Sequence, residues 1–590
     1  MSPFSESETA IRPRSRANQN LSLAELTRLP WVVELLLAAG TFLLFCGTLA
    51  FKFVYDDRMQ ILENVSIRQW SYVPQYFTKN VWAMIDPHIL ANYYRPLFLL
   101  WLRINYALFG LNATGWHALS VALHVIVVVQ VYWLGKRLLQ SDWAAASAAA
   151  LFAVHPVHIE SVTWVSGATD PMLAVFVLAS TLAFLRYIDE SESGHSGKWA
   201  YAASLVFFGL ALLSKEVAIM LPLMLVPMAL YTRKDKTLAR NVGIAAVPFL
   251  LMVVAYLLIR QHALSAFSHP LSTYSTRIML LTWPSVLVFY ARQLFLPLWI
   301  SPYANVHWVT AATREFWIPL AICCALIGTA FVIWNRSTNR KLLTALYAWI
   351  ASPLLPVLYI KVFSPAELVH DRYLYLSSVG FCILAVLAFQ ALRERLSPIA
   401  WKVIGSVVLV ALMLLTFSGE MYWASDLLLF KHAVEVAPDN DSAAVNLGIM
   451  YAEHQRPDLA EPLLKSVYLR SPNSAPAAYN YAELLAGNHQ WAAAEPIMLH
   501  ALQLDPTNDR WWMEFASVEL TLGKVPEAQA AAKRAAQLRP EAQGYHAVLG
   551  VIAFKLGDRQ DAAREFREEL RLHPDNQAAA GGLKELEGVK

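Results

Sequence analysis

A series of long apolar stretches constrains this chain more than any other feature of its sequence. From Trp31 to about Met421 the apolar stretches follow one another with only short polar breaks. A helix needs about 20 mainly apolar residues to cross a bilayer, because in lipid its backbone polar groups must be hydrogen-bonded within the helix. We expect eleven of these stretches to span the membrane, at 31–51, 114–135, 143–157, 168–187, 199–214, 217–232, 241–259, 316–334, 343–361, 373–392 and 401–421.

The composition agrees with two regions that face different solvents. Of the 590 residues, 57% are hydrophobic and only 15% are charged, whereas about a quarter are charged in soluble proteins. After Asp426 the chain becomes polar and rich in alanine. The net charge of +3 is too small to indicate nucleic-acid binding. The four cysteines lie in apolar segments, so we expect buried thiols rather than disulfides or metal ligands.

The distribution of basic residues predicts the topology. Residues 1–30 are polar and rich in arginine, so we expect a disordered cytoplasmic N-terminus followed by an uncleaved first span. The later Lys and Arg clusters fall on the same side if the apolar stretches 95–112 and 278–299 make no net crossing. The first outer loop is then 52–115, and the chain after Tyr422 lies outside. Short loops and an uncleaved anchor favour a bacterial inner membrane with a periplasmic C-terminal domain; in a eukaryote the same topology would place that domain in the lumen of the endoplasmic reticulum.

Internal repeats dominate the C-terminal region, which is predicted to be a separate domain over 422–590. Proline recurs every 34 residues, and alanine recurs in the same register. The period is typical of stacked helix pairs, in which small residues let the helices approach closely, and it resembles the tetratricopeptide repeat (TPR). Such a solenoid presents a concave surface that favours a protein partner, although a structural cap or an oligomerisation surface stays open. The repeated residues are Pro438, Pro472, Pro506, Pro540, Pro574, Ala460, Ala494, Ala528 and Ala562.

Polar residues beside the apolar stretches are the candidates for function, because charges near hydrocarbon are costly. Asp56 and Asp57 follow the first span directly. Adjacent, partly buried carboxylates have raised pKa values, which suits a general base acting on a hydroxyl. A solvated loop start is the simpler alternative. Arg95 opens an apolar stretch, where its fork of donors would bind a phosphate or extend to lipid headgroups.

A second cluster, His155, His158 and Glu160, follows the third predicted span. A metal site is the less favoured interpretation, because the spacing fits no well-defined ligand motif. We expect these side chains to position the acceptor or the donor by hydrogen bonding. Lys215 and Glu216, between two short spans, offer a further phosphate contact with a positioning carboxylate, or a simple internal ion pair.

A third cluster is the charged and aromatic stretch 367–375, which leads into the tenth predicted span. Within it, Arg372 and Tyr373 suit a lipid-linked phosphate at the membrane surface, with Asp371 as a positioning residue. An aromatic anchor at the interface is the alternative. The sequence contains no phosphate-binding loop or soluble-hydrolase motif, so ATP-driven transport has no support.

Taken in order, these motifs resemble a known family. An acidic pair after the first helix is followed by Tyr-Arg-Pro-Leu, His-Pro-x-His-x-Glu, Ser-Lys-Glu, a charged-Arg-Tyr-Leu-Tyr motif and C-terminal TPRs. This set resembles the transmembrane-and-TPR O-mannosyltransferases and their bacterial relatives, within the GT-C class of polyprenol-dependent glycosyltransferases. The implied fold is all-α, with a polytopic GT-C-like domain over 31–421 followed by the TPR solenoid.

The resemblance also implies an activity. A polyprenyl-phosphate sugar would be the donor, mannose would be the first candidate sugar, and protein Ser or Thr recruited by the TPRs would be the acceptor. Asp56 and Asp57 match the acidic motif of the family. Arg372 and Tyr373 match the motif near the donor phosphate, supported by Arg95 and Lys215. This chain has His370-Asp371 where relatives often have a Glu before the Arg, which leaves the donor contact there less defined.

The expected reaction inverts the anomeric centre and needs neither an obligatory metal nor another cofactor. Two other functions stay open at this point. A non-enzymatic membrane scaffold would dock partners on its repeats and bind no lipid-linked sugar. A transporter of lipid-linked glycans would need polar residues along a path through the bilayer, and the sequence places its polar clusters on one side instead.

Overall fold

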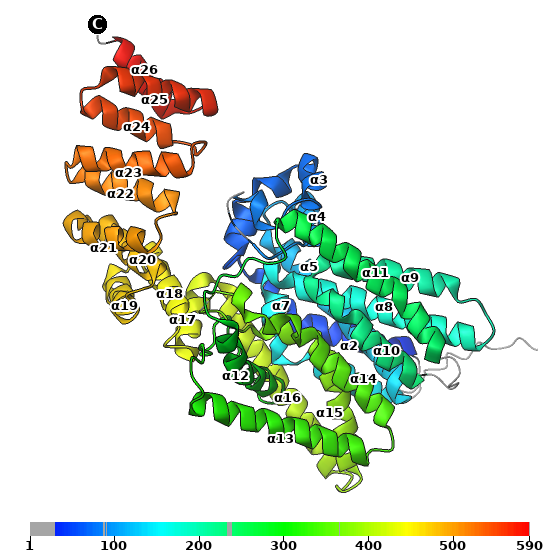
Figure 1. Ribbon diagram of the computed structural model, residues 1–590. Helices are drawn as coiled ribbons and strands as arrows, with labels where there is room; N and C mark the ends of the chain where they lie inside the picture. Colours follow the sequence, from blue (N-terminus) through cyan, green and yellow to red (C-terminus); the bar gives the residue numbers. More distant parts are fainter. Residues whose placement is uncertain (1–29, 87–88, 90, 233–238, 365, 589–590) are drawn as a thin grey trace, which may run out of the picture.

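The computed structural model describes residues 30–86, 89, 91–232, 239–364 and 366–588. Every regular element within them is helical. A bundle of apolar helices occupies one part of the molecule, and a stack of helix pairs extends from it (Figure 1). The predicted all-α class, with membrane helices followed by a repeat solenoid, is therefore confirmed.

The membrane domain runs from Pro30 to Glu420. Its helices are α2 (Pro30–Phe45), α3 (Val73–Tyr76), α4 (Pro96–Phe109), α5 (Ala113–Leu139), α6 (Asp142–Ala153), α7 (Ile159–Thr163), α8 (Thr169–Glu192), α9 (Lys198–Ser214), α10 (Leu221–Thr232), α11 (Ala239–Leu264), α12 (Thr276–Phe295), α13 (Arg314–Arg336), α14 (Arg340–Ala351), α15 (Ser377–Arg393) and α16 (Ala400–Glu420).

Eight helices among the described residues are long and apolar enough to cross a membrane. Seven of them coincide with predicted spans. The predicted spans 143–157, 199–214, 217–232 and 373–392 form the shorter helices α6, α9, α10 and α15. The eighth long helix is α12, which the sequence interpretation left out of the spans. These helices make the chain an integral, multi-pass membrane protein.

The helix α12 lies against the end of the bundle that is next to the repeats. Near its start, Trp283 Nε1 donates to the carbonyl of Leu358 at 2.7 Å. Near its end, Gln293 Nε2 donates to the carboxylate of Asp371 at 2.6 Å. Leu358 and Asp371 lie in the connection between α14 and α15. Two positions of α12 therefore contact this connection.

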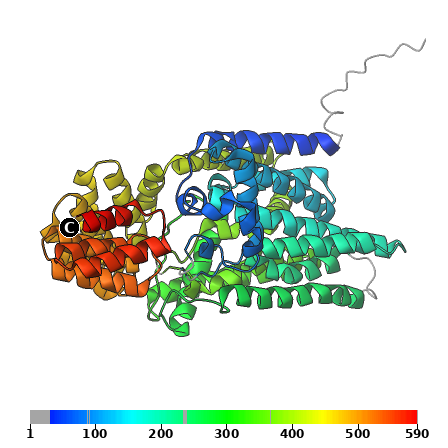
Figure 2. The same ribbon diagram turned by 90° about the horizontal axis from the view of Figure 1, so that it is seen from above.

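The outermost helices expose apolar side chains, as lipid contact requires. Only 6% of the apolar windows of α13 and α16 are buried within the protein, and α2 runs along the edge of the bundle (Figure 2). The α13–α14 and α15–α16 turns, which carry predicted inner-side basic clusters, lie at the end away from the repeats (Figure 1). The predicted cytoplasmic N-terminus, apart from its last residue, lies outside the described residues.

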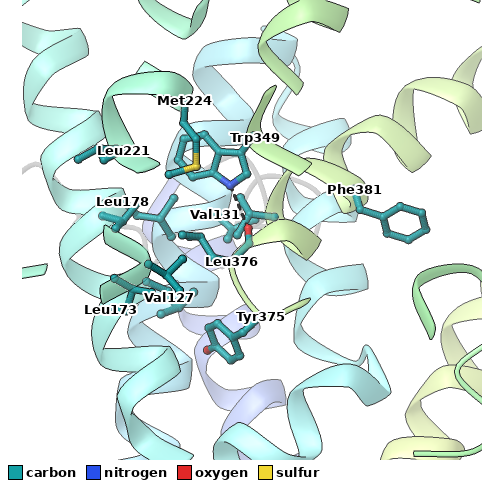
Figure 3. Close-up of a cluster of buried hydrophobic side chains, with 14 of the residues drawn as sticks. Val127, Val131, Leu173, Leu178, Leu221, Met224, Trp349, Tyr375, Leu376 and Phe381 are labelled. Carbon is teal, nitrogen blue, oxygen red and sulfur yellow. Dashed lines mark hydrogen bonds between the residues drawn. The ribbon is translucent and has the colours of Figure 1, made fainter. Parts of the chain in front are cut away.

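A buried apolar cluster in the bundle supports the segment that carries Arg372. Trp349 of α14 packs among side chains of α5, α8 and α10 (Figure 3). Its indole Nε1 donates to the backbone carbonyl of Leu376 at 3.0 Å. Because a buried indole N–H needs a partner, this bond fixes the backbone just after the charged motif.

The repeat region consists of antiparallel helix pairs with very close contacts. The repeated alanines Ala460, Ala494, Ala528 and Ala562 are completely buried. At Gly448 a Cβ atom would lie 2.6 Å from Leu464, so the spacing requires glycine. The repeat helices are α17 (Asp426–Val436), α18 (Asp441–Glu453), α19 (Pro457–Arg470), α20 (Ala475–Gly487), α21 (Trp491–Leu504), α22 (Asp509–Thr521), α23 (Val525–Leu538), α24 (Tyr545–Lys555), α25 (Arg559–Leu572) and α26 (Gln577–Gly588).

The solenoid contacts the membrane domain at two separated places. Near its start, Arg58 of the first outer loop pairs with Asp426 at 3.1 Å and with Glu453 at 3.0 Å. Farther along, after α23, Arg539 pairs with Asp86 of the same outer loop. The repeats are therefore held against the outer loop rather than attached only through α16.

Candidate active site

A cavity of about 390 Å³ lies where the membrane domain meets the first repeat. Residues far apart in the sequence line it, including Asp56, Arg95, Glu367, Arg372 and the repeat residue Asn446. The cavity therefore combines Asp56 and Arg95, from the two ends of the first outer loop, with Arg372 from a later loop.

The two predicted catalytic carboxylates have different surroundings. Asp56 lines the cavity, and burial raises its pKa to about 6 although Arg372 acts in the opposite direction. Asp57 is fully buried. Its Oδ1 accepts hydrogen bonds from the backbone N–H and the hydroxyl of Ser166, and its Oδ2 accepts one from the N–H of Val54. Asp57 thus ties two loops together beside the site.

Arg372 is held in place by a buried carboxylate from the His-Pro-x-His-x-Glu motif. Its Nη1 pairs with Glu160, whose other oxygen accepts the Arg372 backbone N–H at 3.2 Å. Burial would raise the pKa of Glu160, but Arg372 and His370 outweigh this effect and lower the pKa to about 2. The guanidinium also lies over Trp164, 5.1 Å from the ring centroid.

The other predicted phosphate-binding residues lie close to Arg372. Arg95 forms a two-pronged pair with Glu216, at 3.1 and 2.7 Å. The Lys215 ammonium pairs with Asp170 at 2.6 Å and lies 5.0 Å from the ring centroid of Tyr373. Since each cation already has a carboxylate partner, the cluster is preformed without a ligand.

An apolar groove of about 270 Å³ adjoins the cavity. Tyr93, Val362 and Phe363 line both spaces, so the two lie side by side. The groove extends along α11, where Tyr256 and Leu257 line it. An elongated apolar chain in this groove would place its polar end beside Arg95 and Arg372.

Three predicted positioning residues lie behind the cavity rather than in its lining. His155 Nε2 contacts the carbonyl of Leu294 at 3.1 Å, and His158 Nε2 contacts the hydroxyl of Ser378 at 2.9 Å. Asp371 accepts from Gln293 and is almost fully buried. Their contacts hold the loops and α12 in position.

Of the predicted site residues, Asp56, Arg95 and Arg372 line the cavity. Among the lining residues that were not predicted, Glu367 and Asn446 bear most on function. Glu367 lies in the predicted charged stretch 367–375, so the motif itself signalled it. Burial raises the pKa of Glu367 to about 7, and repulsion by Asp56 adds to the shift. Asn446 comes from the repeats, and its Nδ2 donates to the hydroxyl of Tyr303 at 2.8 Å. No sequence signal connects a repeat residue with this cavity.

The described residues contain no group of three or more His, Cys, Asp or Glu side chains arranged to hold a metal ion. The independence from metals and other cofactors expected from the sequence therefore stays a prediction.

Comparisons with known proteins agree with the resemblance drawn from the motifs. Residues 94–260 match the family described as dolichyl-phosphate-mannose-protein mannosyltransferase. Protein O-mannosyl-transferase TMTC3 of Homo sapiens is 24% identical over 94% of this chain and 65% of its own length. TMTC4 of Homo sapiens is 28% identical over 71% of this chain and 64% of its own length. Tmtc2 of Drosophila melanogaster is 34% identical over 43% of this chain and 28% of its own length.

The predicted kinship with the transmembrane-and-TPR O-mannosyltransferases is confirmed by these relatives. The chain spans about two thirds of the length of the first two. Among solved structures, MamA is 20% identical over 27% of this chain and 91% of its own, with a TM-score of 0.24. YrrB, described as a TPR protein with an unusual peptide-binding site, is 18% identical over 29% of this chain and 87% of its own, with a TM-score of 0.25.

Proposed function

We propose that this relative of the protein O-mannosyl-transferases transfers a sugar from a polyprenyl-phosphate donor to a hydroxyl group of an acceptor protein. Mannose is the first candidate sugar, because the similar proteins are named for its transfer. The observation that carries the proposal is the cavity that holds Asp56 opposite Arg95 and Arg372 and adjoins an apolar groove. Transfer then occurs on the periplasmic or lumenal face, where the repeats lie.

The donor is proposed to bind across the junction of the two spaces. Its lipid chain occupies the apolar groove along α11, and its phosphate faces Arg95 and Arg372, with Lys215 and Tyr373 close behind. An arginine has five N–H donors, so contact with Glu160 leaves Arg372 further donors for a phosphate. Preformed cations lower the barrier because they need no reorganisation when charge develops.

Asp56 is proposed as the general base. The acceptor oxygen forms its bond to the anomeric carbon while the bond from that carbon to the phosphate oxygen breaks. The electron pair of the broken bond stays on the lipid phosphate, and the hydroxyl proton passes to Asp56. Attack opposite the leaving group inverts the anomeric centre, through an oxocarbenium-like transition state. Asp57, with Glu160, Glu216 and Asp371, positions the groups around this centre.

The repeats are proposed to recruit the acceptor protein, because Asn446 of α18 reaches the cavity that holds Asp56. An acceptor bound on the solenoid would therefore lie next to the base.

The test uses the purified full chain in lipid nanodiscs with radiolabelled polyprenyl-phosphate mannose. Label transfer to proteins of a periplasmic extract is expected with the wild type and not with Asp56→Asn. Glu63→Gln, which alters an exposed carboxylate of the same loop, serves as the matched control and keeps full transfer. Equal transfer by Asp56→Asn and the wild type would remove Asp56 as the base. No transfer from mannosyl or other sugar donors would favour the scaffold function instead.

A further inference from the structure

A second, larger space adjoins the cavity on the side of the repeats. This groove has a volume of about 810 Å³ and lies between the first helix pairs of the solenoid and two outer loops of the membrane domain. Ser364, Glu367 and Asn446 line both the groove and the cavity. The groove on the repeats and the cavity that contains Asp56 are therefore next to each other and share these side chains.

We call this 810 Å³ space the acceptor groove. Direct hydrogen bonds join the repeats on one side of it to the loops of the membrane domain on the other. Asn440, at the start of α18, donates its Nδ2 to the carbonyl of Ala366 at 2.7 Å. Asn446 donates to Tyr303 at 2.8 Å. Because these bonds join the first repeat to the outer loops on either side of Glu367, the groove does not depend on a bound ligand for its shape.

The lining of the acceptor groove mixes carboxamide, hydroxyl and charged side chains with aliphatic ones such as Val445 and Ile449. Asn446 and Asn480 are 34 residues apart, so they occupy the same position in successive repeats. A carboxamide offers both a donor and an acceptor, which matches the N–H and C=O of a peptide group. These paired carboxamides, rather than flat aromatic rings on which sugars stack, are the recognition groups that successive repeats place in the described lining, and they favour a polypeptide.

The charges of the groove add a second element of selectivity. Arg470 is paired with Asp441 at 2.7 Å, which neutralises both. Asp439 and Glu367 also line the groove, and His307 is the remaining ionisable residue there. The acidic balance favours a segment that carries basic residues near its hydroxyl group.

We infer that the acceptor groove binds an extended polypeptide segment and delivers its Ser or Thr hydroxyl past Glu367 to Asp56. Asn446 and Asn480 hydrogen-bond the backbone of this segment. A single extended chain fits a groove that lies between the repeats and two loops and meets the catalytic cavity at Ser364, Glu367 and Asn446. The inference rests on the proposed function and names the kind of acceptor that it requires.

Binding to the groove can be measured without any sugar transfer. The probe is a short fluorescein-labelled peptide of Gly, Ala, Ser and Thr flanked by lysines, added to the full chain in nanodiscs. Asn480→Ala is expected to weaken binding about threefold to tenfold, the loss of about one hydrogen bond. Asn488→Ala changes an asparagine just beyond α20 that is not in the groove lining, and it is expected to bind like the wild type.

Transfer kinetics and cross-linking separate the inference from the proposed function. With polyprenyl-phosphate mannose present, Asn480→Ala is expected to raise the KM for the peptide and to keep kcat. A benzophenone-bearing version of the peptide is expected to cross-link to groove residues of α18 and α20. Absence of peptide binding, equal affinity in wild type and Asn480→Ala, or competition by neutral dextran would overturn the inference. Groove binding without donor turnover would overturn only the proposed function.

Discussion

The membrane domain and the solenoid use charged residues in opposite ways. In the membrane domain the pair Lys215–Asp170 has side chains that are 1% and 6% exposed. In the solenoid the pair Arg456–Asp458 is 54% and 59% exposed. A buried pair is costly to form and more costly to break, whereas an exposed pair contributes little. The Lys215–Asp170 pair is therefore expected to matter for stability, and the Arg456–Asp458 pair is expected to contribute little to it.

The two regions also differ in how far they depend on small residues at repeated positions. The solenoid depends on alanine and glycine where its helices touch, and these positions repeat every 34 residues. The chemistry of the cavity depends on single, unrepeated side chains such as Asp56 and Arg372. Changes that test this contrast are expected to separate activity from stability.

The largest expected effect is on transfer by Asp56→Asn. Removal of a general base costs about 10²- to 10⁴-fold in rate, so kcat is expected to fall by that factor while the protein stays folded. Asp57→Asn is the comparison, because the Asp57 carboxylate bonds to backbone and Ser166 rather than facing the cavity. It is expected to lower the unfolding temperature more than Asp56→Asn does. If Asp57→Asn abolished transfer and Asp56→Asn mainly lowered the unfolding temperature, Asp57 would be the base and Asp56 the structural residue.

The next largest effect is on stability, through Lys215→Met. This change leaves Asp170 buried without its partner and is expected to cost about 3–5 kcal/mol, read from thermal unfolding in detergent. Arg456→Gln, which breaks an exposed pair in the solenoid, is expected to leave the unfolding temperature unchanged. Similar losses in both variants would contradict the contrast between the two regions.

Overpacking in the solenoid is expected to have a smaller effect. Gly448→Ala places a methyl group against Leu464 and is expected to cost about 1–3 kcal/mol. The control is Gly487→Ala, since a Cβ atom there meets no other atom within 4 Å. Measurement of unfolding by circular dichroism should show the loss in the first variant alone.

The pH dependence of transfer is expected to follow Asp56. Burial raises the pKa of its carboxyl to about 6, and a base acts only when it is deprotonated. The rate should therefore be high above pH 6, fall through that value, and drop about tenfold for each further unit of acid. Glu63→Gln is expected to keep this profile. A rate that stays constant down to pH 4 would remove a carboxylate base from the mechanism.

The sequence was sufficient to predict where the helices lie in the chain, and which of them contact lipid and which contact water. Each predicted span corresponds to a helix, and the 34-residue period predicted the helix pairs. Hydrophobic length was less decisive for crossing, since α12 is long enough to span and was not predicted to do so. Pairings across long distances could not be predicted. Glu160 lies 212 positions before Arg372, and no local pattern indicates that the two meet.

The site residues illustrate the same limit. The motif order placed Asp56 and Arg372 on one face, but adjacent residues such as Asp56 and Asp57 look equivalent in a sequence. The structure distinguishes them, because Asp57 bonds to Ser166 and Val54 whereas Asp56 lines the cavity. The histidines of the second motif suggested contact with substrate, whereas packing placed His155 and His158 behind the cavity. Asn446 belongs to a different domain, so its part in the lining required the fold.

The two separated contacts of the solenoid with the first outer loop have a mechanical consequence. A stack of repeats behaves as a spring, since each repeat touches only its neighbours. The Arg58–Asp426 pair attaches the solenoid to the outer loop near its first helix pair, and the Arg539–Asp86 pair attaches it again after α23. Tension applied to the repeats beyond α23 is therefore taken up first at the Arg539 contact. The first repeats, next to the catalytic cavity, bear no force until the Arg539–Asp86 pair breaks.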